Sequence, residues 1–393
     1  MRCRLNEVGR KQKPGLRAAS KYSLRSRLWM LAPVFLAALT AACAGGGSGI
    51  NPPPPGGASE WFFVDSFAGQ VGGFTAASGQ LGPLPGSSLN FNTNSSLSLF
   101  SIAVDPKGMF VAGIKLDSPT MGTLQIADIA SGGAISLTQL TASVANPVGV
   151  AISPQGAIAV SDGISAIEFF TVQNHALLAG PTQPTSVSPA DLAFRADGKV
   201  LFALNAASAI SVFSVAPDLS LQLVQNATLP LAPGQFQGGV VRFRLNAAGN
   251  KIAATTLDGW LYVGEVSATD GTISGITEIQ VAPNANLQEV VLDPSGQSVY
   301  ASDQDNGGIY EVSTTGGSLK ALTGSPLPTL PGPTGMECNS AGDRVYVVNG
   351  AAFPQGQIVT FSRELATGKL MATGDSVSAG EIFASRIVRV PSH

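Results

Sequence analysis

Short apolar runs, each followed by a tight-turn motif and then by an alternating apolar and polar run, recur along most of the chain. The turn motif consists of an apolar residue, a small polar or charged residue, two variable positions and a glycine. Its six copies begin at Val104, Ile152, Phe194, Leu245, Leu292 and Cys338. The closing glycines (Gly108, Gly156, Gly198, Gly249, Gly296 and Gly342) follow one another at intervals of 42 to 51 residues. This interval is typical of a four-stranded blade of a β-propeller.

Each repeat also predicts its individual strands. The run before the turn, such as GVAI at 149–152, is the innermost strand, and the run after it, such as AIAVSD at 157–162, is the second. Proline suits the second position of such a turn, and the glycine adopts a positive φ without a side-chain clash. A third strand follows, as in AIEFFTV at 166–172, and weaker segments such as LSLQLV at 219–224 are the outermost strand.

The two ends of the repeat region predict how the ring closes. WFFVDS (61–66) and QVGGFTA (70–76) supply the second and third strands of a further blade, but no inner strand precedes them. ASRIVRV (384–390) resembles an inner strand, and no second strand follows it. We therefore expect an all-β, seven-bladed propeller in which the C-terminal strand completes the N-terminal blade. This arrangement removes exposed sheet edges.

The segment before the repeats has the pattern of an export signal. A basic region precedes the twelve-residue apolar run 28–39, which is too short to span a bilayer. The small residues before Cys43 resemble a bacterial lipobox, so we predict a lipoprotein signal peptide at 1–42 and lipidation of Cys43. Cleavage near Ala42 without lipid is the alternative. A Gly- and Pro-rich tether at 43–58 then leads to the propeller at 59–390.

Composition and charge agree with this picture. Only 12% of the residues are charged, whereas the chain has 46 Gly and 26 Pro, which suits short strands and many turns. Nine of the 22 Lys and Arg residues precede residue 28, so the chain from Cys43 onward has 13 basic and 24 acidic residues and a net charge of −11. An acidic surface repels phosphate backbones, so we do not expect a nucleic-acid partner.

One row of charged residues on the inner strands is a candidate ligand site. Asp191, Arg242 and Glu289 each lie three residues before the apolar residue of the turn, in three consecutive blades. At about 3.3 Å per residue they lie about 10 Å above the bottom turn, towards the upper mouth of the channel. The row could hold a polar ligand. The alternative is a structural network of ion pairs between blades, because buried charges are normally paired.

A second set of polar residues ends the second strands. Side chains of Asp and Asn commonly hydrogen-bond the backbone of turns, and calcium coordination is the alternative if their oxygens converge on the axis. The set consists of Asp65, Asp162, Asn205, Asp303 and Asn349. We expect turn formation and predict no metal site.

The segments DPSGQSVYASD, NSAGDRVYVVNG and ADGKVLFALN resemble the YVTN-type repeats of the seven-bladed superfamily that includes the 6-phosphogluconolactonase-like lactonase family. The resemblance covers about residues 59–390 and implies a propeller fold and a lactonase activity. The turns of that family often contain His-Pro, whereas the turns of this chain read Asp-Pro, Ser-Pro or lack proline, and the chain has only two histidines. This difference weakens the prediction of lactonase activity.

Sequence motifs for metal, nucleotide or Ser-His-Asp chemistry are missing, and we expect no cofactor. Our first hypothesis is a monomeric, exported, lipid-anchored binding module of the cell envelope, in the outer membrane or at the periplasmic face. Its upper face would bind a protein, a glycan or a small molecule. The second hypothesis is a lactonase-like hydrolase in which Arg242 polarises a carbonyl and Asp191 or Glu289 activates water. A purely structural envelope protein is the third.

Overall fold

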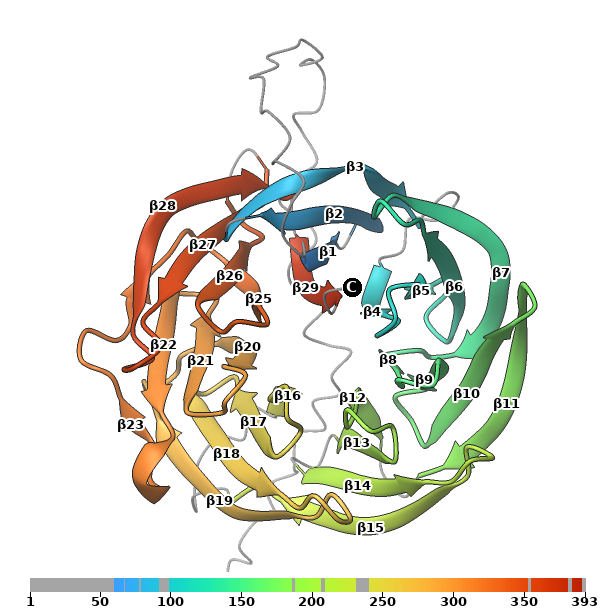
Figure 1. Cartoon of the computed structure of the whole chain (residues 1–393). Helices are drawn as coiled ribbons and strands as arrows, with labels where there is room; N and C mark the ends of the chain where they lie inside the picture. The colour runs from blue at the N-terminus through green and yellow to red at the C-terminus, as the bar shows by residue number, and fades with distance from the viewer. Residues whose placement is uncertain are drawn as a thin grey trace, which may run out of the picture. The chain divides into compact units, whose positions relative to one another are not determined.

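The computed structural model describes residues 60–66, 68–77, 79–91, 99–185, 188–205, 209–230, 240–352, 355–380 and 384–390. Their strands form seven antiparallel sheets arranged as blades around a common axis (Figure 1). The seven-bladed propeller predicted from the repeats is therefore confirmed. The predicted signal peptide (1–42), Cys43 and the tether (43–58) lie outside the described residues and remain predictions.

Each blade begins with an innermost strand at the axis and ends with an outermost strand at the rim of the ring. The first blade comprises β29 (Ala384–Val390), β1 (Glu60–Ser66), β2 (Gln70–Ala77) and β3 (Gln80–Asn90). The second comprises β4 (Leu99–Val104), β5 (Phe110–Leu116), β6 (Met121–Ile129) and β7 (Ile135–Ala145). The third comprises β8 (Gly149–Ile152), β9 (Ala157–Ser161), β10 (Ala166–Gln173) and β11 (Ala176–Pro184). The fourth comprises β12 (Pro189–Phe194), β13 (Val200–Asn205), β14 (Ala209–Val215) and β15 (Leu221–Thr228).

The remaining three blades follow in chain order. The fifth comprises β16 (Val240–Leu245), β17 (Lys251–Thr256), β18 (Trp260–Val266) and β19 (Ile273–Gln280). The sixth comprises β20 (Leu287–Leu292), β21 (Ser298–Asp303), β22 (Gly308–Ser313) and the short outer strands β23 (Lys320–Ala321) and β24 (Leu327–Pro328). The seventh comprises β25 (Pro333–Cys338), β26 (Arg344–Asn349), β27 (Gln357–Arg363) and β28 (Leu370–Ser378). A single-turn 3₁₀ helix, Thr315–Gly317, lies between β22 and β23. Among the described residues, no helix has the length and apolar character needed to cross a membrane.

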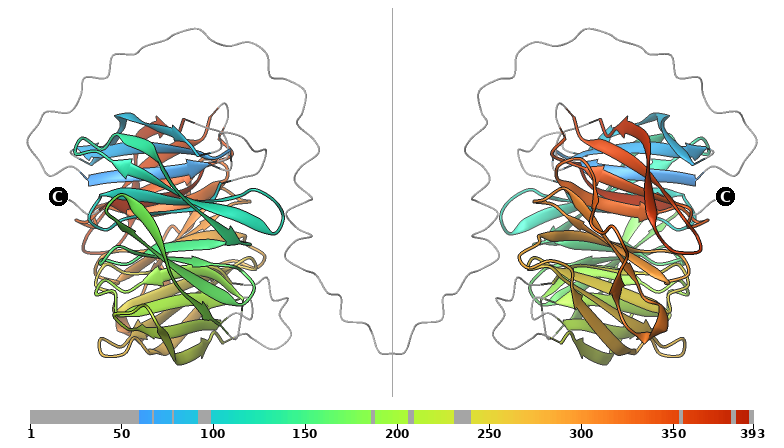
Figure 2. Two further views of the ribbon diagram at one scale, coloured as in Figure 1. Left: turned by 90° about the vertical axis from the view of Figure 1, so that its right-hand side faces the viewer. Right: turned by 90° about the vertical axis from the view of Figure 1, so that its left-hand side faces the viewer.

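The ring closes where the C-terminal strand joins the first blade. β29 pairs with β1 in an antiparallel register that places Val388 opposite Phe63 and Ile387 opposite Val64. The closure predicted from the chain ends is thus confirmed, and β1 has a neighbour on both sides. Two side views show the outer strands of successive blades side by side along the rim of the ring (Figure 2).

The core lies between neighbouring blades and not in one central layer. Where the first and seventh blades meet, Phe62 and Val64 of β1 pack against Tyr346 and Val348 of β26. The rings of Phe62 and Tyr346 meet edge to face, with centroids 4.8 Å apart, a favourable arrangement of aromatic quadrupoles. Because each blade buries its faces only against its neighbours, the inner strands can present polar side chains to the axis.

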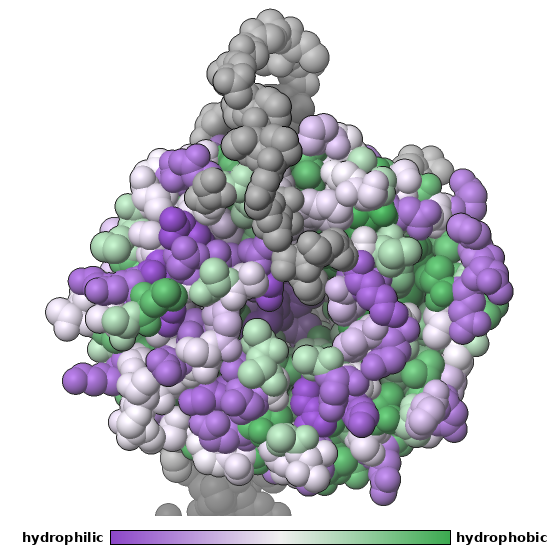
Figure 3. Space-filling view, in the orientation of Figure 1, coloured by the Kyte–Doolittle hydropathy of each residue, from purple (hydrophilic) through white to green (hydrophobic). Residues whose placement is uncertain are grey.

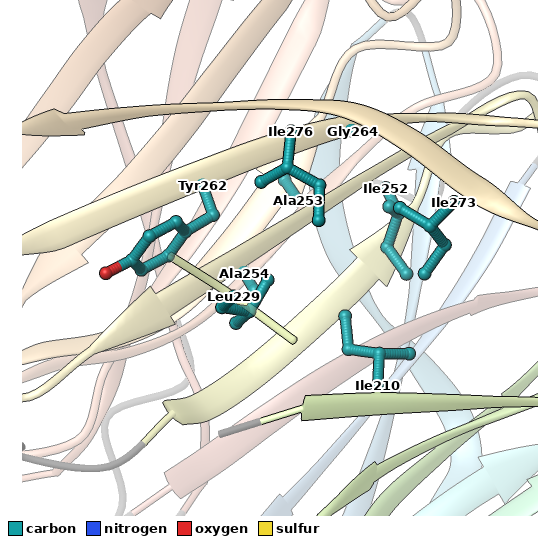
Figure 4. A pocket seen from close by; sticks show the side chains of 9 residues that line it. All are labelled: Ile210, Leu229, Ile252, Ala253, Ala254, Tyr262, Gly264, Ile273 and Ile276. Carbon is teal, nitrogen blue, oxygen red and sulfur yellow. The ribbon is translucent and has the colours of Figure 1, made fainter. Parts of the chain in front are cut away.

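The packing between the fourth and fifth blades leaves one small void. Its volume is about 10 Å³, and its lining is apolar and includes Ile210, Ile252 and Ile273 (Figure 4). Such a volume is near the lower limit for a single water molecule, which would also need polar partners. We therefore interpret this void as a packing feature of the core and not as a ligand site.

Candidate functional site

The ring is hollowed at its centre, and hydrophilic residues surround the hollow on the face shown in Figure 3. The innermost strands β4, β8, β12, β16, β20, β25 and β29 line this channel. Their charged side chains form one continuous group, which we call the channel cluster. It consists of Asp191, Arg242, Arg244, Glu289 and Arg386.

A β-bulge precedes each of the three site residues predicted from the sequence. The pairing of the inner with the second strand shifts between Pro189 and Asp191. It shifts likewise between Val240 and Arg242, and between Leu287 and Glu289. A bulge inserts an unpaired residue and changes the direction of the side chains that follow. The repeated bulge therefore gives Asp191, Arg242 and Glu289 equivalent positions in three consecutive blades.

Asp191 is the centre of the cluster. Its Oδ1 accepts a hydrogen bond of 2.9 Å from Nη2 of Arg386, and its Oδ2 lies 3.4 Å from Nη1 of Arg244. Burial alone would raise the pKa of Asp191, but the guanidinium groups of Arg386, Arg242 and Arg244 outweigh burial, and the pKa is lowered. Asp191 is therefore a carboxylate at neutral pH, and its role towards the arginines is structural.

The ion pair between Arg386 and Asp191 spans the channel. Arg386 belongs to the first blade and Asp191 to the fourth, and these blades face each other across the ring (Figure 1). Arg386 also donates a hydrogen bond to Oγ of Ser101 in the second blade, and its backbone N–H donates to Oδ1 of Asp65 at 2.7 Å. One side chain thus ties three blades together at the axis.

Glu289 is held by an arginine from the neighbouring blade. Its Oε2 accepts a hydrogen bond of 2.9 Å from Nη2 of Arg244, and its side chain is only 1% exposed. The same guanidinium contacts Asp191, so Arg244 bridges the fourth and sixth blades from the fifth. Both predicted carboxylates are therefore already paired with protein cations.

Arg242 differs from the other arginines of the cluster. Its nearest carboxylate oxygen, Oδ2 of Asp191, is 3.9 Å from its Nη1, which is too long for a hydrogen bond. Its side chain is 27% exposed, compared with 6% for Arg386. Burial and the charge of Arg386 lower the pKa of Arg242 to about 10, so the group remains a cation at neutral pH. Its guanidinium group makes no hydrogen bond to the described residues.

The second predicted set does not converge on the axis. Oδ1 of Asp162 accepts hydrogen bonds of 2.8 Å from the backbone N–H groups of Ile164, Ser165 and Ala166. Oδ1 of Asp303 accepts from the backbone N–H groups of Asp305 and Asn306. These are hydrogen bonds of turn-forming side chains. Among the described residues, no group of three or more His, Cys, Asp or Glu side chains has a metal-binding arrangement.

The other members of this set make equally local or inter-strand contacts. Oδ1 of Asn205 accepts from the backbone N–H of Ala209 at 3.2 Å. Asn349 accepts a hydrogen bond from the hydroxyl of Thr329 and donates one to its own strand, at the carbonyl of Val347. Asp65 is the exception, because its carboxylate accepts from Ser385 and Arg386 of β29 and so lies beside the channel cluster.

Glu337 is a further carboxylate of the inner strands. It is half-buried on β25, and Oε1 accepts a hydrogen bond of 3.1 Å from the backbone N–H of Cys338. No guanidinium among the described residues lies within 4.0 Å of it. Burial raises the pKa of Glu337 to about 7, although the charges of Arg389 and Arg244 oppose the rise. Unlike Asp191, this group can exchange a proton near neutral pH.

Solved structures with this architecture are similar over nearly their whole length. A putative 6-phosphogluconolactonase from Bacteroides fragilis matches with a TM-score of 0.67 at 18% identity, over 86% of this chain and 100% of the other. The periplasmic gluconolactonase of Pseudomonas aeruginosa matches with a TM-score of 0.65 at 16% identity, over 85% and 100%. A protein from Lactobacillus plantarum matches with a TM-score of 0.66 at 12% identity, over 84% and 99%.

This chain has the seven-bladed propeller fold of these solved structures. The fold implied by the repeat segments is therefore confirmed. No protein-family model and no curated protein matches the sequence. At these identities the solved structures establish the architecture alone, so the chemistry of this propeller has to be argued from its own channel.

Sequence reasoning found three members of the cluster, Asp191, Arg242 and Glu289, but it did not place Arg244 or Arg386 among the candidate site residues. The first three share one offset from the turn motif, whereas β29 is followed by no turn from which to count. The pairing of β29 with β1 also shifts between Ala384 and Ile387. The one available signal was an arginine in a strand expected to line the axis of the propeller.

Proposed function

We propose that this chain is an exported, lipid-anchored binding module whose central channel takes a small polar ligand with a carboxylate or carbonyl oxygen. A sugar lactone, or the sugar acid formed when it opens, is the ligand class that fits best. The observation that supports this proposal is the environment of Arg242, a partly exposed guanidinium on the channel-lining strand β16 without a hydrogen bond to any described residue.

The charge balance of the cluster favours an acceptor oxygen at Arg242. The cluster contains three guanidinium groups and two carboxylates. Arg244 and Arg386 already pair with Asp191 and Glu289, so the charge of Arg242 is the least compensated of the three. A ligand carboxylate could accept two parallel hydrogen bonds from Arg242, which are among the stronger interactions available to a protein. Because Asp191 holds the surrounding arginines in place, little reorganisation is needed on binding.

The solved structures support the proposed ligand class, and the leader sequence supports the proposed location of the protein. One solved structure with this fold is described as a 6-phosphogluconolactonase and another as a periplasmic gluconolactonase. Sugar lactones combine a carbonyl with several hydroxyls. The basic and apolar leader before Cys43 supports export, and the lipobox-like residues support a lipid anchor at Cys43.

Calorimetric titration with D-gluconate tests the role of Arg242. We expect Arg242→Gln to weaken binding by about tenfold to a hundredfold, because a charge-assisted hydrogen bond contributes about 1.5–3 kcal/mol. Arg344→Gln is the matched control, since Arg344 is also partly exposed but pairs with Asp343 outside the cluster. Equal affinities for Arg242→Gln and the unmodified chain, or no gluconate binding at all, would overturn the proposal.

Glu337 supports lactone hydrolysis as a second candidate function. Asp191 and Glu289 are poorly suited to activate water because both are paired with guanidinium groups. Glu337 has a pKa raised to about 7 by burial, which is the range expected of a general base at neutral pH. Hydrolysis should therefore become faster as the pH rises through about 7 and Glu337 loses its proton.

Lactone hydrolysis measured from pH 5 to pH 9 tests this candidate. The unmodified chain should show a rate that increases with an apparent pKa of about 7, and Glu337→Gln should remove this step while keeping gluconate binding. If the unmodified chain does not accelerate hydrolysis above the spontaneous rate, the binding function alone remains. A pH profile unchanged by Glu337→Gln would exclude Glu337 as the base.

A further inference from the structure

A second cavity lies in the first blade, beside the end of β28 in the seventh. Its volume is about 320 Å³, which is within the range of small-molecule sites. Residues of β1, β2 and β3 and the end of β28 line it. They include Asp65, Ser66, Gln70, Gly72, Ser88 and Ser378.

Asp65 connects this cavity with the channel cluster. Its side chain is 1% exposed, and its Oδ1 accepts hydrogen bonds from Oγ of Ser385 at 2.5 Å and from the backbone N–H of Arg386 at 2.7 Å. Its Oδ2 has no hydrogen-bond partner among the described residues. A buried carboxylate oxygen without a donor is energetically costly, and a ligand that supplies a donor would remove this cost.

The rest of the lining limits the chemistry of the ligand. Ser66, Ser88 and Ser378 bring hydroxyls and Gln70 brings an amide, while Phe74, Pro83 and Leu84 form an apolar wall. No Lys, Arg or His is among the described lining residues, so a carboxylate or phosphate ligand would meet Asp65 without a cation in the described lining to compensate. The lining suits an uncharged molecule with hydroxyl donors and apolar C–H faces.

We propose that this cavity binds one uncharged sugar ring, with a ligand hydroxyl donating to Oδ2 of Asp65. The site is separate from the gluconate site proposed at Arg242, and the two proposals can fail independently. Because the other oxygen of Asp65 holds the backbone of Arg386, occupancy of the cavity is linked through two hydrogen bonds to the ion pair that spans the channel.

Titration of the full chain with methyl β-D-glucoside tests the proposal. Gly72→Leu should weaken binding by at least about tenfold, because the added side chain fills the cavity. The atoms nearest to a Cβ at Gly72 would be the Phe74 ring at 3.4 Å and the carbonyl oxygen of Ala379 at 3.6 Å, both ordinary contacts. Gly82→Leu in the same blade is the control, because nothing lies within 4 Å of its added Cβ and it does not line the cavity.

Two further variants separate the possible outcomes. Asp65→Asn keeps an acceptor oxygen but removes the charge, and we expect weaker glucoside binding with cooperative unfolding retained. Arg242→Gln should keep glucoside binding while losing gluconate binding. No glucoside binding by the unmodified chain, or equal affinities for Gly72→Leu and Gly82→Leu, would refute the cavity site. Should Gly72→Leu not fold, crystals of the unmodified chain soaked in the glucoside decide: density in the cavity supports the proposal, and an empty cavity refutes it.

Discussion

Deletion of β29 (Ala384–Val390) is expected to abolish cooperative folding of the propeller. Ala384, Ile387 and Val390 are at most 2% exposed, and burial of each large aliphatic side chain contributes about 1.5–3 kcal/mol. The deletion also removes a whole strand of backbone hydrogen bonds and leaves β1 as an open edge. The total loss is comparable to the entire stability of a typical domain, about 5–15 kcal/mol.

Urea unfolding followed by circular dichroism measures this effect. The chain without β29 should show no cooperative unfolding transition. A synthetic ASRIVRV peptide added in trans should restore part of the transition by pairing with β1. Arg389→Lys provides a mild control in the same strand, because it keeps a cation near Glu60. A deleted chain that unfolds at the same urea concentration as the full chain would show that ring closure does not stabilise the fold.

The fold could be predicted from the sequence because its information is local and repeated. Each turn motif has the same two neighbouring strands, and the glycine at its end has a positive φ, as in Gly108 and Gly342. The incomplete blades at the two ends of the chain complement each other. Counting the strands of these two incomplete blades predicted ring closure, and the pairing of β29 with β1 confirms it.

The contacts of the channel could not be predicted in the same way. They depend on which side chains meet across the axis from blades far apart in the sequence. Asp191 and Arg386 are separated by 195 residues, and no local pattern relates them. The pKa of Glu337 likewise depends on its burial in the folded ring and on the nearby charges of Arg389 and Arg244. The periodicity of the sequence predicts neither the ion pair across the axis nor the pKa of Glu337.

Replacement of Asp191 by alanine is the second change expected to have a large effect. It would leave Arg386 buried without its carboxylate and remove one of the two partners of Arg244. Removing one partner of a buried ion pair typically costs about 3–5 kcal/mol. Asp343→Ala is the control, because the side chains of Asp343 and Arg344 are 41% and 26% exposed in their pair, and exposed pairs contribute at most about 1 kcal/mol.

The pH dependence of stability provides an independent check of this ion pair. The pKa of Asp191 is lowered in the folded chain from a model-compound value of 3.8. The stabilisation is therefore complete above the unfolded pKa and is lost as the pH falls towards the folded value. The difference in stability between the unmodified chain and Asp191→Ala should be constant from pH 5 to pH 8 and decrease below about pH 4. A difference under about 1 kcal/mol at pH 7 would mean that the pair is not a structural link.

A crystal structure of the chain grown with D-gluconate tests the proposed function most directly. We predict electron density in the central channel, with the gluconate carboxylate within hydrogen-bonding distance of the guanidinium group of Arg242 and the ion pair between Asp191 and Arg386 intact. A channel without ligand at a saturating concentration, or gluconate bound only at the outer strands, would contradict the proposal.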